Sequence, residues 1–319
     1  MTTHSLLLAL AAGIISAVVF ASATTGFMLL RLVLFFLTPL SLYLAGLGLG
    51  PIPAAIAAIT ATGAVMAMSN PVTAMVYALS TGIPAVMISR LALLSRTDGD
   101  LQHWYPVGRI VIAAAAFGGC FAALVMVLMG ADVETLTKAM RTVVEAFVKT
   151  ELPNIPGAPT FNDAQIGEIT DTALRSLPWI LGCLSMATAL INLWLAGRIT
   201  LASGRLTRPW PDLAGMELPG MAAFGLIGAT AATFARGFGG LLAGGFAGPF
   251  TLAFALLGLC VAHVLTRGSP WRNFILTSLY AALVVISAGA SLVLAIIGLA
   301  ETIFHYRRAS ERQPPTSPS

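Results

Sequence analysis

The length of its apolar stretches is the feature that most constrains this chain. Two apolar blocks, residues 6–129 and 179–306, flank one long polar interval, residues 131–177. A bilayer core of about 30 Å takes about 20 apolar residues per helical span, and the blocks offer many such runs. Backbone polar groups in hydrocarbon are satisfied only in helices or closed barrels, and the runs lack the alternation of barrel strands. The sequence therefore predicts an all-α, polytopic integral membrane protein.

Composition supports this class and narrows the partners. Charged residues make up 9% of the chain, against roughly 25% in soluble domains. The net charge of +4 comes from basic residues scattered through loops, without a basic stripe interleaved with aromatics. We therefore expect a lipid bilayer as partner and no nucleic acid. The three cysteines, Cys120, Cys183 and Cys260, lie in apolar runs without metal-ligand spacing, so neither metal, cofactor nor disulfide is expected.

The N-terminal segment, residues 1–130, is predicted to hold five membrane helices. The first apolar run has no Lys or Arg before it, which favours a retained helix over a cleaved signal peptide. Glycine and proline breakers separate the runs that follow. The predicted helices cover about 6–20, 27–47, 53–68, 71–94 and 110–129.

Small residues recur every fourth position on the first predicted helix, at Ala9, Gly13 and Ala17. Such a row allows another helix to approach closely. Two interpretations are open: packing within the chain, or docking to a separate protein.

The polar interval, residues 131–177, is predicted to form an extracytoplasmic helical insert. Apolar residues from Val133 to Val148 follow a helical period, with Asp132 placed to cap that helix. Three prolines in residues 152–159 indicate an extended or turning linker. Asn162 and Gln165 resemble a capping box for a second, short helix that ends before Pro178. Two short helices cannot bury a core of their own, so we expect the insert to lie against the spans or the head groups.

The C-terminal segment, residues 178–306, is predicted to hold helices 6–10. Three helices are expected over about 178–197, 221–234 and 250–265. The last apolar run, residues 273–306, would be about 51 Å long as one helix, so two spans with a turn near 287–291 are favoured. This makes about ten spans, with nine as the alternative. Residues 307–319 read as a disordered cytoplasmic tail.

Charge decides the predicted topology. Loops 90–109 and 198–208 each carry three Arg and loop 267–272 carries two, whereas the insert has four Lys or Arg against seven Asp or Glu, a net of −3. Basic short loops favour the cytoplasm. Both termini are then cytoplasmic if there are ten spans.

Two short segments carry a resemblance to a known family. One is the 197–219 loop, with Arg208-Pro209-Trp210-Pro211-Asp212-Leu213; the other is Gly298-Leu299-Ala300-Glu301-Thr302 followed by Arg307-Arg308. These resemble YybS-like bacterial membrane proteins, a domain-of-unknown-function family (2232). The resemblance extends loosely along most of the chain and implies a multi-pass protein of the bacterial inner membrane.

That family is in turn similar, in its N-terminal helices, to the substrate-binding S-components of energy-coupling-factor vitamin transporters. In S-components a row of small residues on the first helix contacts the transport module. The resemblance therefore implies a transport-related protein in which Ala9, Gly13 and Ala17 meet an energising module.

Two arginines are candidate contacts for a solute. Arg31 lies near a membrane boundary, where it either snorkels to head groups or contacts an anionic substrate. Arg236 is followed by a glycine cluster between Gly237 and Gly248, closed by Pro249. That cluster predicts either a broken, re-entrant segment of a binding site, or a loose loop with close helix packing.

Three further candidates are polar residues in or beside apolar helices: Asn70, Asn192 and His263. Asn192 and His263 are read either as ligand contacts or as interhelical hydrogen bonders. Glu301 either pairs with Arg307 or Arg308 or couples to protons.

Trp210, held between two prolines, is a candidate interfacial anchor or partner-docking point. The sequence lacks a Gly-x-Ser-x-Gly elbow and a His-Glu-x-x-His motif, so no enzyme is expected. Two hypotheses follow. One is an S-component-like protein that binds a small solute. The other is a non-catalytic scaffold in envelope assembly or division, with Trp210 on its partner surface.

Overall fold

The computed structural model describes residues 2–23, 27–150, 152–154 and 159–307, and it is an all-α membrane protein. Eight apolar stretches in this part of the chain are long enough to cross a bilayer. They are α1 (Thr3–Ser22), α2 with α3 (Met28–Leu37, Leu40–Leu49), α4 (Pro51–Met68), α5 through η1 to α6 (Pro71–Tyr77, Ala78–Gly82, Ile83–Leu93), α7 (Val107–Met129), α9 (Asp163–Ala202), α11 (Phe238–Leu265) and α13 (Ser287–Phe304). Two shorter apolar helices are α10 (Met221–Ala232) and α12 (Arg272–Val285).

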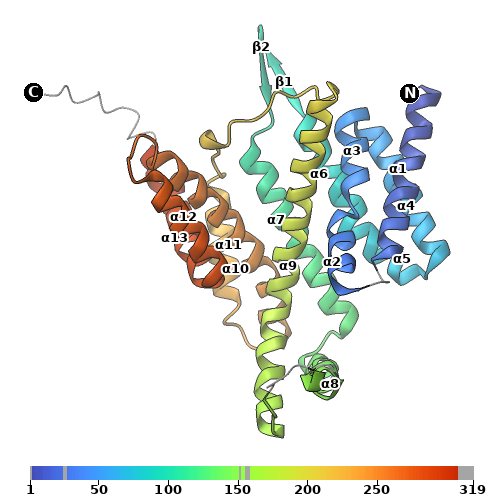
Figure 1. Ribbon diagram of the computed structural model, residues 1–319, viewed down its shortest axis with the longest axis vertical. Coiled ribbons are helices and arrows are strands. Elements are labelled where there is room, and N and C mark those ends of the chain that lie inside the picture. Colours follow the sequence, from blue (N-terminus) through green and yellow to red (C-terminus); the bar gives the residue numbers. More distant parts are fainter. Residues whose placement is uncertain (1, 24–26, 151, 155–158, 308–319) are drawn as a thin grey trace, which may run out of the picture.

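Helices α1 to α6 form the N-terminal bundle, at the right of Figure 1. A buried hydrogen-bond chain joins three of them: the Ser16 hydroxyl donates to the Thr38 carbonyl at 2.6 Å, and Tyr77 Oη lies 2.6 Å from the Ser16 oxygen. Because the serine proton goes to Thr38, Tyr77 is the donor of the second bond. These three residues thereby pair their polar groups inside an apolar interior, whereas the buried Tyr43 hydroxyl of α3 has no partner among the described residues.

The row of small residues on α1 is used within the chain. Ala9, Gly13 and Ala17 are buried, and a Cβ added at Gly13 would lie 2.4 Å from the Ala57 carbonyl oxygen of α4. The row was expected to contact an energising module, but in the structure it packs against α4 and is not accessible to a separate protein. Close packing of two helices of the same chain is the alternative that the structure shows.

Helices α7, α9, α11 and α13 form the C-terminal bundle, with α10 and α12 beside it (Figure 1). The last apolar run is split as predicted, with α12 ending at Val285 and α13 beginning at Ser287. The turn lies one residue before the predicted range. Of the tail predicted over 307–319, only Arg307 belongs to the described residues.

The predicted boundary between insert and sixth span is absent. Asn162 and Gln165 do form the predicted capping box, but the helix that they start, α9, continues for 40 residues through Pro178. Pro178 is buried and contacts α11 near Gly244. Tertiary packing thus outweighs the backbone hydrogen bond that proline removes.

The glycine cluster is helical and not re-entrant. Helix α11 begins at Phe238, twelve residues before the predicted start, and runs through Pro249. Gly244, Gly245 and Gly248 are buried in it. The close helix packing of the second interpretation therefore agrees with the structure, whereas its loose loop does not, because residues 238–248 are helical.

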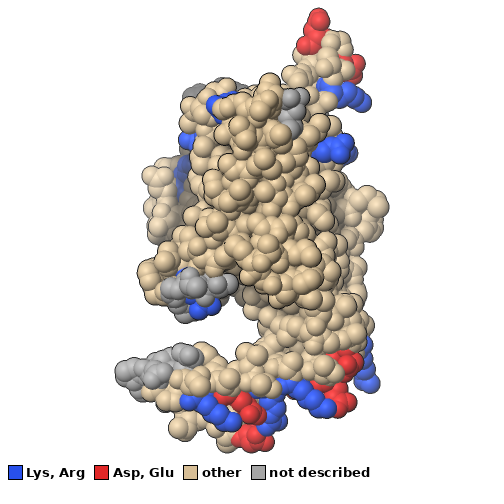
Figure 2. All heavy atoms as spheres, turned by 90° about the vertical axis from the view of Figure 1, so that its right-hand side faces the viewer, with Lys and Arg blue, Asp and Glu red and all other residues tan. Residues whose placement is uncertain are grey.

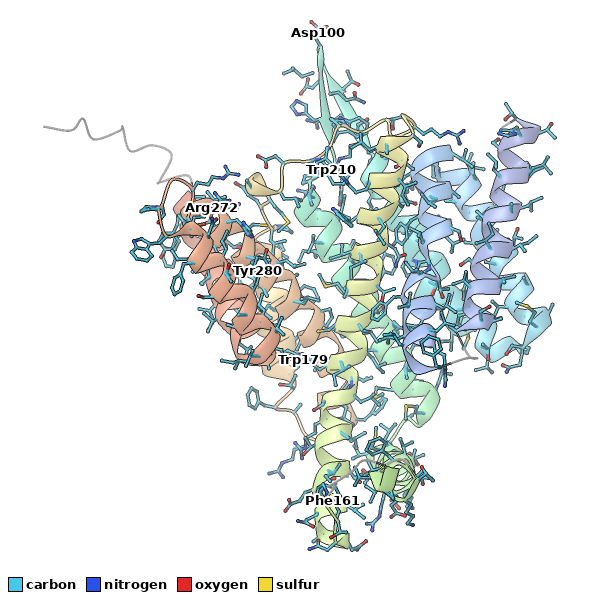
Figure 3. The ribbon with its side chains drawn as sticks, viewed as in Figure 1. Asp100, Phe161, Trp179, Trp210, Arg272 and Tyr280 are labelled. Atoms are coloured by element: carbon cyan, nitrogen blue, oxygen red, sulfur yellow. The ribbon has the colours of Figure 1, made fainter. Side chains whose placement is uncertain are left out.

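A short antiparallel hairpin, β1 (Ser95–Asp98) and β2 (Leu101–Trp104), was not predicted. It projects from one end of the molecule, with Asp100 at its tip (Figure 3). Figure 1 places the start of α1, the hairpin and the end of α13 at this end, and α8 with the start of α9 at the other. Assignment of the hairpin end to the cytoplasm stays a prediction from loop charge.

Figure 2 shows charged side chains gathered toward the two ends, with a broad, almost uncharged surface between them. An uncharged belt of this kind is what a bilayer core requires. The same view shows a hollow between the insert end and the rest of the molecule.

The insert consists of α8 (Val133–Thr150), the short turn η2 (Leu152–Asn154) and the first part of α9. Asp132 caps α8 as predicted, accepting a hydrogen bond from the Thr135 amide at 2.8 Å. The apolar face of α8 buries Leu136, Met140 and Val144 against α9 and the start of α11. The insert thus shares its small core with the membrane helices.

Charge also joins α8 to α9. Arg141 bonds Glu145 on α8 at 2.8 Å and Asp163 at the start of α9. The hydrogen bond from Arg141, with a second from Lys149, lowers the pKa of the Glu145 carboxyl. Hydrogen bonds from Thr135 likewise lower the pKa of Asp132.

A carboxyl whose pKa is lowered on folding stabilises the fold above its ordinary pKa, and this stabilisation is lost as the pH falls through the lowered value. Because the bonds of Glu145 and Asp132 lie within α8, we expect this helix to lose stability below roughly pH 4. Hydrogen exchange of the α8 amides, corrected for intrinsic rates, measures this. Glu145→Gln should reduce the difference between neutral and acidic pH, and protection that does not change with pH would contradict the expectation.

Candidate functional site

A cavity of about 510 Å³, lined by both charged and apolar residues, lies where the insert meets the C-terminal bundle. Its walls come from the first turns of α8, from α9 around Trp179 (labelled in Figure 3), from the 233–237 turn and from the start of α11. The volume falls within the range of small-molecule sites, about 300–1,000 Å³. The lining residues are Val133, Thr137, Asp171, Leu174, Arg175, Trp179, Thr233, Phe234, Ala235, Arg236, Gly237, Gly240, Leu241 and Gly244.

Two arginines, Arg175 and Arg236, and one carboxylate, Asp171, give this cavity a net positive charge. All three side chains are exposed, and none of them forms an ion pair within the part of the chain that the structure describes. Leu174, Trp179 and Leu241 add apolar surface beside the charges. Cationic and apolar groups side by side suit an organic anion better than a bare inorganic one.

Glycines shape the wall formed by the 233–237 turn. Gly237 has φ +79°, a left-handed conformation that favours glycine, and it immediately precedes α11. A Cβ added at Gly240 would lie 2.2 Å from the Ala235 carbonyl oxygen, so the turn folds directly onto the first turn of the helix. The free N–H groups of that turn add positive potential at the same place as Arg236.

Among the five predicted solute contacts, only Arg236 lines this cavity. Arg31 is exposed on α2 and its Nε lies 3.4 Å from the Ala23 carbonyl. Asn70 caps α5, accepting a hydrogen bond from the Thr73 amide at 2.9 Å. Neither Arg31 nor Asn70 therefore lines the cavity with Arg236.

Asn192 and His263 form interhelical bonds. The buried Asn192 amide donates to the Phe36 carbonyl of α2 at 2.6 Å and to the Thr188 carbonyl at 2.7 Å. His263 Nε2 lies 2.9 Å from Tyr280 Oη, which joins α11 to α12. The hydrogen-bonding interpretation holds for both contacts.

Two cavity residues, Asp171 and Arg175, were missed as candidates. Their four-residue spacing places both on one face of a helix, and that signal was present in the sequence. They were overlooked because the helix was assigned to an insert separate from the membrane core. No group of three or more His, Cys, Asp or Glu suited to a metal occurs in the described part of the chain.

The two segments that carry the family resemblance meet at the hairpin end. The buried Glu301 carboxylate accepts a 2.9 Å hydrogen bond from Arg307 Nε. The same guanidinium donates to the carbonyls of Ala214 and Met216, directly after the Pro-Trp-Pro-Asp run. The predicted structural pairing of Glu301 is therefore confirmed, and it fixes the 203–220 loop to the end of α13.

Trp210 lies in this loop at the same end of the molecule (Figure 3). Its ring packs against Gly197, and the Arg198 guanidinium lies 5.2 Å from the ring centroid. Nearby, Arg208 donates to the carbonyls of Ala92 and Tyr105 at 2.9 and 3.0 Å. The loop therefore lies against the ends of three membrane helices, and 38% of Trp210 is exposed for any partner.

Comparison with known proteins gives one family. Residues 14–240 match the family described as "Predicted membrane protein (DUF2232)". No curated protein and no solved structure matches the chain. The matched region covers most of the 319 residues and includes the insert, both cavity arginines and the 203–220 loop, whereas the cavity residues Leu241 and Gly244 lie beyond it. The chain therefore belongs to the DUF2232 family of predicted membrane proteins.

Proposed function

We propose that this protein binds a small organic anion in the Arg175–Arg236 cavity and takes part in its transport. The observation that carries the proposal is a cavity of about 510 Å³ with two arginines that have no partner ion within the described residues. The cavity lies at the insert end, which loop charge assigns to the extracytoplasmic side. A solute from outside the cell would meet it first.

The contacts of the insert support its role as a wall of this site. Val133 and Thr137 of α8 line the cavity, and the cluster around Leu136 fixes α8 to the same part of α9 that carries Arg175. An opening of α8 would change access to both arginines. The proposal needs no catalytic step.

Calorimetry on the full-length protein in mild detergent tests binding, with benzoate as probe and the neutral benzamide as matched control. A charge-assisted hydrogen bond contributes about 1.5–3 kcal/mol, so Arg175→Gln and Arg236→Gln should each weaken benzoate binding roughly 10–100-fold. Arg90→Gln, an exposed arginine of α6 outside the cavity, should leave binding unchanged. Equal binding of benzoate and benzamide would sink the proposal.

The transport part of the proposal implies a partner that supplies energy. Since α4 covers Ala9, Gly13 and Ala17, an energising module would engage another face of the molecule. Co-purification from bacterial membranes in mild detergent should recover an ATPase together with the chain. Recovery of the chain without an ATPase, combined with no solute uptake in reconstituted vesicles, counts against transport.

The scaffold hypothesis, in envelope assembly or division, makes a different prediction. There, Trp210→Ala would abolish complex formation while Arg175→Gln and Arg236→Gln would have no effect. The packing of Trp210 against Gly197 and Arg198 favours a role within the fold, and we therefore prefer solute binding.

A further inference from the structure

A second cavity, of about 420 Å³, lies at the hairpin end beneath the 203–220 loop. Its walls come from α7, α9 and α11, with Leu47 of α3 and Ala92 and Leu93 of α6, and apart from Arg208 and Cys260 they are apolar. The Arg208 guanidinium is committed to two backbone carbonyls. The interior therefore favours a hydrocarbon occupant over a polar solute.

The surroundings of the cavity indicate where such an occupant comes from. Ile191 and Trp194 line it from α9, yet they are 48% and 53% exposed on the outside of the bundle. An exposed apolar surface on a membrane helix faces lipid, so the bilayer lies next to the cavity. Lipid chains are the hydrocarbon within reach of it.

The edge of the cavity carries Arg198, Arg205 and Arg208 against the carboxylate of Asp212, which lies between the lining residues Pro211 and Leu213. Arg198 follows the lining residue Gly197, is exposed, and stacks on the Trp210 ring without an ion pair among the described residues. Arg205 is exposed in the same loop. Cations beside a pocket between membrane helices are typical of sites for anionic lipid head groups.

We propose that this cavity binds one acyl chain of an anionic diacyl phospholipid, whose phosphate is held by Arg198 over the Trp210 ring. Charge complementarity at the edge and the apolar interior together select this occupant. The site lies about 35 Å along α9 from Arg175, at 1.5 Å per residue over 23 residues. Its test is therefore independent of solute binding.

Native mass spectrometry of the full-length protein in detergent tests the proposal. The probe is dioleoyl phosphatidylglycerol, and phosphatidylcholine with the same chains is the matched comparison. We expect one tightly retained phosphatidylglycerol and binding at least tenfold weaker for phosphatidylcholine. Arg198→Gln should lose about tenfold in affinity for phosphatidylglycerol, whereas Arg267→Gln, an exposed arginine at another loop, should keep the wild-type value.

Filling the cavity tests the chain-binding part. Val111→Phe, or Leu259→Trp if the first variant fails to fold, should abolish retention without lowering the thermal unfolding midpoint. Equal retention of both phospholipids, or no effect of Arg198→Gln and of the filling variants, would overturn the proposal. Displacement of phosphatidylglycerol by an isoprenoid phosphate at equal concentration would overturn the assignment of a diacyl lipid.

Discussion

Glu301→Gln is expected to destabilise the protein by about 3–5 kcal/mol, because it leaves the buried guanidinium of Arg307 without a counter-charge. The two side chains are only 5% and 7% exposed. Arg307 would keep its bonds to the carbonyls of Ala214 and Met216. The free energy of unfolding therefore falls because a positive charge stays buried without its carboxylate. Unfolding of the full-length protein in a denaturing detergent titration measures the change.

The double variant Glu301→Gln/Arg307→Met separates the ion pair from other effects. Removal of both charges should cost less than the sum of the single substitutions, since no unpaired charge remains buried. As a control, Asp98→Asn removes one partner of the exposed Arg96–Asp98 pair of the hairpin, and no measurable loss is expected. A Glu301→Gln variant as stable as the Asp98→Asn control would refute the role given to this pair.

Helix class and most span positions could be predicted because they depend on local pattern. Apolar run length located the spans, and the Asn162–Gln165 capping box located the start of α9. The split of the last run likewise follows from bilayer thickness. The break at Pro39 was not predicted, because 27–47 was taken as one helix.

The errors come from positions where tertiary contacts outweigh local rules. Proline is usual in the first turn of a helix, so Pro178 was read as a start, yet here it lies inside α9 against α11. The glycines from Gly237 to Gly248 were read as possible breakers, but two of them, Gly245 and Gly248, face neighbouring helices, where an added Cβ would lie 2.9 Å from Ala122 or 2.7 Å from the Trp179 carbonyl oxygen. A pattern of glycines alone does not distinguish these cases.

The candidate site was predictable only in part. Arg236 was singled out by its charge in an apolar setting, and it lines the cavity. Its partner Arg175 lies 61 positions away on a helix that was assigned to the insert, and only the continuity of α9 brings it to the membrane core. The side chains of Asn192 and Asn70 instead form hydrogen bonds with backbone groups. Polarity in an apolar run therefore does not separate a binding residue from a structural one.

The second large effect is expected at the contact of α11 with α13. Gly298→Leu should destabilise the protein by about 3 kcal/mol or more, at the upper end of the range for overpacking. A Cβ added at Gly298 would lie 2.0 Å from the Phe254 carbonyl oxygen, and one added at Gly258 would lie 1.9 Å from that of Leu294. The obstacle on each side is backbone, so neither helix can yield by a change of rotamer. The same detergent titration measures the loss.

Two glycines that face open space provide the matched controls. Among the described residues, nothing lies within 4 Å of a Cβ added at Gly63 on α4 or at Gly228 on α10. Gly63→Leu and Gly228→Leu should therefore leave stability unchanged or raise it by up to about 1 kcal/mol, because leucine favours helices more than glycine does. Gly258→Leu should match Gly298→Leu, since the two residues form opposite sides of one contact. If all four variants were equally stable, α11 and α13 would not be packed through these glycines. The position of α13 that allows Glu301 and Arg307 to hold the 203–220 loop would then be in doubt.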